Sequence, residues 1–99
     1  MIVNELCMWP VPQDIRREAE LLCGDNSFSL VFICRKSDIA DDNHLFLVIA
    51  VRRTRRVRPF VVWTFNSSLH TLGLGHYDLT LSEAIRLVGG LMYERGTDE

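Results

Sequence analysis

Five arginines lie close together in the second half of the sequence, and their type and spacing most directly suggest a chemistry. Each guanidinium is permanently charged and presents a planar fork of donors that matches a phosphate or a carboxylate. The arginines therefore predict a partner-binding site for a nucleic acid or for an acidic protein surface. A charged loop that protects a sheet edge against aggregation is the alternative. The cluster consists of Arg52, Arg53, Arg55, Arg56 and Arg58.

A second group of candidate residues lies further along the chain. His70 and His76 are six residues apart, so on one continuous strand they would share a face. Together with Asp78 and Cys34 they could form an acid–base or metal site. The chain has neither a G-x-S-x-G nucleophile turn nor the full set of glycines and the lysine of a phosphate loop. We therefore expect no catalytic residue, no metal and no cofactor, and a small nuclease or toxin that uses His70 or His76 is the weaker alternative.

Length and composition limit the number of domains. The chain has 99 residues, of which 47% are hydrophobic, enough to build one core but not two. We predict a single domain over residues 1–99, with an irregular N-terminal segment over 1–11 and a frayed tail over 96–99. The 11 basic and 13 acidic side chains argue against a general binder of polyanions.

No membrane span and no secretory signal are expected. The longest apolar run, Leu45 to Val51, is far shorter than the roughly 20 residues of a spanning helix. The N-terminus MIVNELCMWPVP lacks a basic leader followed by a long apolar stretch. Cys7, Cys23 and Cys34 are odd in number and irregularly spaced, so we expect reduced thiols and no disulfide framework. These features predict a cytoplasmic protein without a membrane partner.

Two helices are predicted, one towards each end of the chain. Apolar residues recur at helical spacing after Pro12 and Gly24 supplies a stop, which predicts a helix over residues 12–23. The second helix follows Thr80, which has capping-box spacing to Glu83. A glycine pair at 89–90 lies inside its apolar pattern. We expect the helix to continue through this pair, which would let another backbone come close.

The segments between the helices are rich in β-branched and aromatic residues, which is typical of strands. A possible fourth strand over residues 69–78 is weakened by Gly73 and Gly75. The order α-β-β-β-(β)-α predicts an α+β fold with a single antiparallel sheet of three to four strands between an N-terminal and a C-terminal helix. The three clear strands are predicted over residues 27–36, 44–53 and 58–66.

This order of elements resembles that of double-stranded RNA-binding domains. Those domains place a lysine-rich motif at the start of the last helix, where it bridges phosphates. The corresponding stretch here is GLGHYDLTLSEA, with Asp78 and Glu83 where positive charge would be needed. The resemblance therefore stops at topology, and the sequence argues against binding of double-stranded RNA.

Both faces of the predicted sheet are apolar. A strand that is half exposed to water should alternate apolar and polar residues, whereas these strands are hydrophobic at both sets of positions. Two short helices cover one face of a sheet well but two faces only thinly, so we expect a partner to cover the remaining surface. A self-sufficient monomer with one helix on each face is the alternative. In the first strand, the pattern predicts Phe28, Leu30, Phe32 and Cys34 on one face, with Val31 and Ile33 on the other.

The functional prediction is a small non-enzymatic module that acts by binding protein, either as a homodimer or by docking on a partner complex. Such modules are typical of accessory proteins of phages, plasmids and bacterial operons, by association only. The alternative is a nucleic-acid-binding regulator that uses the arginine-rich hairpin 52–58. Trp9, Trp63 and Tyr93 are candidate contact anchors, with Trp9 expected on the partner-binding surface and Trp63 in the core.

Overall fold

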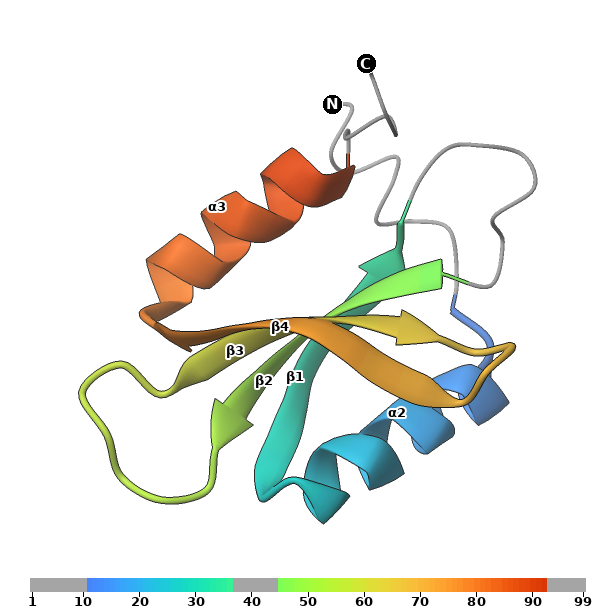
Figure 1. Ribbon diagram of the computed structural model, residues 1–99, viewed down its shortest axis with the longest axis horizontal. Coiled ribbons are helices and arrows are strands. Elements are labelled where there is room, and N and C mark those ends of the chain that lie inside the picture. The colour runs from blue at the N-terminus through green and yellow to red at the C-terminus, as the bar shows by residue number, and fades with distance from the viewer. Residues whose placement is uncertain (1–10, 37–44, 93–99) are drawn as a thin grey trace.

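The chain forms one four-stranded antiparallel sheet between two helices (Figure 1). This confirms the predicted α+β class, and the uncertain fourth strand is present. The computed structural model describes residues 11–36 and 45–92, so the predictions for Trp9, Tyr93, the tail and most of the N-terminal segment lie outside the described residues. The elements are α2 (Gln13–Asp25), β1 (Phe28–Arg35), β2 (Leu45–Arg52), β3 (Phe60–Asn66), β4 (Thr71–Leu79) and α3 (Leu81–Met92).

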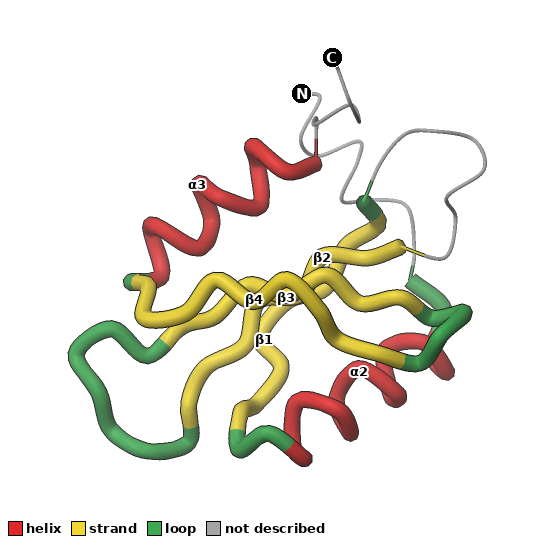
Figure 2. Tube along the Cα trace, viewed as in Figure 1, coloured by secondary structure: helices red, strands yellow, loops and turns green. Residues whose placement is uncertain are grey.

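The two helices lie on opposite faces of the sheet (Figure 2). The strand order is β1-β2-β3-β4, α2 packs against β1 on one face, and α3 packs against β2, β3 and β4 on the other. The expectation of a sheet face without a helix was therefore wrong. The strands are only seven to nine residues long, and a helix of 12 or 13 residues rises about 18–20 Å, enough to follow most of their length. A single chain thus supplies a cover for each face.

Each side of the sheet has its own hydrophobic cluster. In β2 and β3, alternate residues point to opposite sides, as the sequence pattern indicates. The cluster on the α2 side consists of Ala19, Cys23, Phe28, Ile33, Phe46, Val48, Ala50, Val61, Trp63 and Phe65. The cluster on the α3 side consists of Cys34, Leu47, Ile49, Val62, Ala84 and Val88.

A β-bulge at Val31 changes the side of the sheet to which the following side chains of β1 point. Leu30 pairs with Ala50 and Phe32 pairs with Ile49, so one extra residue is inserted in β1. An inserted residue reverses the side-chain alternation that follows it. Phe32 therefore packs on the α3 side, whereas the alternation in the sequence had placed it on the same face as Leu30.

The sequence predicted the start of α3 correctly but not the end of α2. The capping box at the start of α3 is confirmed, since Glu83 N donates to Thr80 Oγ1 at 3.2 Å and Thr80 N donates to Glu83 Oε1 at 2.9 Å. As expected, α3 continues through the glycine pair. The predicted stop of the first helix at Gly24 was wrong, because α2 runs on to Asp25 and the chain turns at Ser27, where φ is 68°. Within the described chain, no helix is long and apolar enough to cross a bilayer.

Candidate interaction surface

The β2–β3 loop, residues 53–59, carries four of the five clustered arginines and projects from one end of the molecule (Figure 1). Backbone hydrogen bonds close its base. Arg52 N donates to Pro59 O at 2.8 Å, and Arg53 N donates to Ser27 O at 3.1 Å. The second bond ties the loop to the turn between α2 and β1, so the loop leaves the sheet in a defined direction.

Arg52, at the end of β2, is held by aromatic rings. Its guanidinium carbon lies 4.9 Å from the centroid of the Phe28 ring and 6.0 Å from that of Tyr77. Its Nη2 is also 3.9 Å from a carboxylate oxygen of Asp78. A guanidinium over ring faces and beside a carboxylate is stabilised within the molecule. Arg52 therefore joins β1, β2 and β4.

Arg53 and Arg58 hold the two sides of the loop base. Arg53 Nε donates to Ser29 Oγ at 3.3 Å. Arg58 Nε donates to the backbone carbonyl of Asp78 at 3.0 Å, and its Nη2 donates to both carboxylate oxygens of Glu83 at 2.6 Å each. Arg58 thus fixes the loop to the joint between β4 and α3.

Glu83 serves both the helix cap and the loop. The backbone N–H of Thr80 donates to this carboxylate and lowers the pKa of Glu83 from its usual value, and Arg58 acts in the same direction. Both effects favour the charged carboxylate. Its ionised form therefore supports the start of α3 and the base of the loop together.

The tip of the loop is exposed to solvent. Arg55 and Arg56 have no hydrogen-bond or ion-pair partner within residues 11–36 and 45–92. Val57, next to them, is 92% exposed. We call these three residues the loop tip. The structure thus divides the five predicted partner-binding arginines into three with a partner in the described chain and two without one there. Partner binding itself stays a prediction.

Trp63 lies in the core, as expected. It is buried beneath the aromatic group that holds Arg52, and its Nε1 donates to Tyr77 Oη at 3.0 Å. A Cβ on Gly75 would lie 2.4 Å from the Tyr77 ring and 2.8 Å from Trp63 Nε1. Gly75 therefore lets Tyr77 lie across β4 and reach Trp63. The glycine that weakened the strand prediction has a packing role.

The two histidines lie on different sides of the sheet. His70 precedes β4 with φ 60°, and its Nδ1 contacts a carboxylate oxygen of Glu18 on α2. His76 pairs with Val62, which belongs to the cluster on the α3 side. The expectation that they would share a face was wrong, because His70 is not in the strand. Among the described residues, no three His, Cys, Asp or Glu side chains come close enough to hold a metal.

The described cysteines are internal. Cys23 and Cys34 are buried in the clusters on opposite sides of the sheet. Burial raises the pKa of Cys23 to about 11, with a smaller contribution from Glu20. A protonated, buried thiol is a poor nucleophile. Cys23 therefore acts as a small apolar residue of the core.

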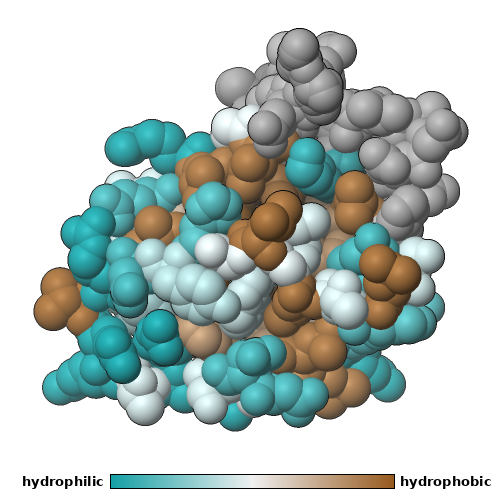
Figure 3. Space-filling model, viewed as in Figure 1, coloured by the Kyte–Doolittle hydropathy of each residue, from teal (hydrophilic) through white to brown (hydrophobic). Residues whose placement is uncertain are grey.

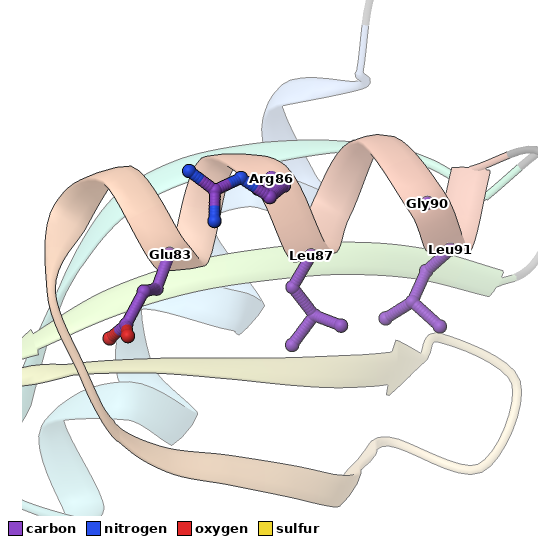
Figure 4. Close-up of a pocket in the computed structure, with 5 residues that line it drawn as sticks. All are labelled: Glu83, Arg86, Leu87, Gly90 and Leu91. Atoms are coloured by element: carbon purple, nitrogen blue, oxygen red, sulfur yellow. The ribbon is translucent and has the colours of Figure 1, made fainter.

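A groove of about 540 Å³ follows one flank of α3 (Figure 4). A Cβ on Gly90 would meet no atom of the described chain within 4 Å. Within the described residues, no other backbone therefore comes close enough to this position to require a glycine. The groove begins at Glu83, the residue that holds Arg58, and is open to solvent beside the loop base. Its lining consists of Glu83, Arg86, Leu87, Gly90 and Leu91.

Comparison with known proteins finds no match: no protein-family model, no curated protein and no solved structure is significantly similar to this chain.

Proposed function

We propose that the protein acts by docking the loop tip onto an acidic surface of another protein. The observation that supports this most directly is the division of the arginines. Arg52, Arg53 and Arg58 contact other described residues, whereas Arg55 and Arg56, beside the exposed Val57, have no partner among residues 11–36 and 45–92. Between residues 52 and 59 there is no acidic side chain to neutralise them. The tip is a positively charged projection that can bind an anionic partner.

The construction of the loop favours specific docking. Its base is tied to the α2–β1 turn and to the β4–α3 joint, so the tip is presented in one orientation. A group that is ordered before it binds loses less conformational entropy in the complex. Arginine is enriched in protein interfaces, where its fork can bind a carboxylate while its stem packs against apolar groups. Val57 adds an apolar contact of the kind that fits a pocket on a folded partner.

A protein partner is favoured over a nucleic acid by the small number of free charges. The whole chain has a net charge of −2, and only two arginines at the tip have no described partner. Two phosphate contacts would give a slope of only about −1.8 for log affinity against log salt on duplex DNA. This is far less than dedicated nucleic-acid-binding surfaces provide, and an exposed valine adds nothing to phosphate binding.

Affinity purification from the source cell, with single-residue variants as baits, tests this proposal. We expect one acidic protein to be captured by the unaltered chain and lost with Arg56→Glu. Arg86→Glu, an equal change of charge at an exposed site on α3, is the matched control and should retain the partner. With purified partner, Arg55→Glu combined with Arg56→Glu should weaken binding at least about 100-fold, because two attractive pairs become repulsive.

Two results would count against the loop tip as a protein-docking element. One is a captured partner that binds the Arg56→Glu bait as tightly as it binds the unaltered chain. The other is tight binding of a labelled DNA or RNA duplex that depends on Arg55 and Arg56 and weakens steeply with salt. The second result would favour the nucleic-acid-binding alternative.

A further inference from the structure

Leu74 in β4 has both an unfavourable backbone conformation and an exposed apolar side chain. Its φ is 53°, a left-handed conformation that residues with a Cβ rarely adopt. Its side chain is nevertheless 78% exposed to solvent. The left-handed position falls on this leucine although Gly73 and Gly75 stand on either side of it. An exposed leucine in such a conformation points to a contact outside the chain.

The register of β4 places Leu74 on the α2 side of the sheet, because Leu74 and Gly75 both lie opposite Trp63, a residue of the cluster on that side. The contact between Glu18 and His70 holds the β3–β4 turn against α2, which places Leu69, 68% exposed, beside the helix. Leu21, 65% exposed, lies one helical turn after Glu18 on the same flank of α2. Figure 3 shows hydrophobic side chains exposed where β4 passes over α2. We call this the α2–β4 surface, and it consists of Leu21, Leu69, Leu74 and Tyr77.

The charges beside this surface match a second copy of the chain. A shallow groove of about 450 Å³ follows the exposed flank of α2 and is lined by Asp14, Arg17 and Leu21, among others. Asp14 and Arg17 are one turn apart, are exposed and have no partner within the described chain. In a contact with two-fold symmetry the same surface meets itself. Arg17 of each copy can then meet Asp14 of the other, whereas a partner of a single charge would repel one of the two.

We infer that the α2–β4 surface binds the same surface of a second copy, with the leucines at the centre and the Asp14–Arg17 pairs at the rim. This dimer differs from the sheet-to-sheet dimer that the sequence suggested, because a helix now covers each sheet face. It uses neither Arg55 nor Arg56. Both copies therefore keep their loop tips available, and the inference does not depend on the proposed docking function.

Sedimentation velocity on the full chain, from about 1 to about 200 μM, tests the dimer. We expect the dimer fraction to rise with concentration. Leu74→Gly suits the left-handed backbone and removes the apolar side chain from both halves of the contact, so it should weaken association at least about tenfold. Ile85→Gln alters another exposed apolar residue, on α3, and should leave association unchanged.

A charge exchange tests the symmetry of the contact. Arg17→Asp places like charges opposite each other and should weaken association about three- to tenfold. Adding Asp14→Arg to the same chain restores an opposite pair at each rim and should recover the original affinity. A chain that remains monomeric over the whole concentration range would overturn the inference, as would a dimer that Leu74→Gly leaves unaltered. The Arg55 and Arg56 variants should not change association, so either proposal can fail without the other.

Discussion

β3 and β4 are hydrogen-bonded neighbours, yet they contribute to the molecule in opposite ways. β3 pairs residue by residue with β2, and its Val61, Val62 and Phe65 are fully buried. β4 pairs with β3 in an interrupted register and is exposed along most of its length. The comparison indicates that the inner strands determine the fold, whereas the irregular edge strand provides surface.

The irregular positions of β4 are also the ones that both proposals use. The pairing of β4 with β3 shifts register at two places. Each place includes a residue with a left-handed backbone conformation, Leu74 or Asp78. Leu74 is one of the exposed residues of the α2–β4 surface. Asp78 offers its backbone carbonyl to Arg58 and its carboxylate to Arg52, so it holds the base of the arginine loop. Bulges on an edge strand also discourage further strands from pairing with it.

The largest expected difference between the two strands is in core stability. Phe65 in β3 is fully buried and pairs with Leu72 in β4, which is only half-buried. Phe65→Ala should lower the free energy of unfolding by about 3–5 kcal/mol, because it removes a buried ring and leaves a cavity. Leu72→Ala should cost distinctly less. Urea denaturation followed by circular dichroism measures both, and equal losses would contradict the contrast between the strands.

The next effect concerns the close packing around Gly75 in β4. Gly75→Ala would drive a methyl group into the Tyr77 ring and disturb the bond from Trp63 Nε1 to Tyr77 Oη. We expect a loss of about 1–3 kcal/mol, typical of overpacking, with a change in tryptophan fluorescence. At Gly73 a Cβ would meet nothing within 4 Å, so Gly73→Ala is the matched control. Similar losses at both glycines would show that packing over Gly75 does not matter.

The same contrast explains what could be predicted from the sequence. Runs rich in β-branched and aromatic residues predicted β1 to β3 closely, because these strands carry apolar residues on both sides of the sheet. No sequence pattern marks the bulge at Val31. The side of the sheet to which Phe32 points was therefore predicted incorrectly. The amphipathic pattern of a helix indicates that it covers a surface but not which face of the sheet it covers.

The arginine cluster was recognisable, but its division was not. Spacing alone treats five neighbouring arginines alike. The partners that distinguish them lie far along the chain, since Ser29 is 24 residues from Arg53 and Glu83 is 25 residues from Arg58. Only the fold brings these groups together. The capping-box pattern did indicate that Glu83 would face the start of α3, but not that it would also bind Arg58.

A smaller effect, of opposite sign, is expected at the first bulge of β4. Leu74→Gly relieves a left-handed leucine, which costs about 1–2 kcal/mol, but adds the greater chain entropy of glycine, about 0.5–1 kcal/mol. At concentrations where the chain is monomeric, the variant should therefore be about as stable as the unaltered chain, or up to about 1 kcal/mol more stable. A marked loss of stability would mean that Leu74 packs within its own subunit, contrary to its role as exposed surface.

The smallest effect tests how the end of β4 is tied to the loop and to α3. The folded-state pKa of Glu83 is lowered, by the Thr80 N–H first and by Arg58 in addition. Its charged form therefore adds stability that is present above the unfolded-state pKa, near 4.5, and is lost as pH falls through the lower folded-state value.

Glu83→Gln keeps a capping side chain but does not titrate. The difference in unfolding free energy between the unaltered chain and this variant should be constant near neutral pH and shrink below about pH 4.5. Asp25→Asn, at an exposed carboxyl with no described partner, serves as the control. Parallel stability curves into acid for the unaltered chain and Glu83→Gln would mean that the ionised carboxylate does not fasten the loop to the β4–α3 joint.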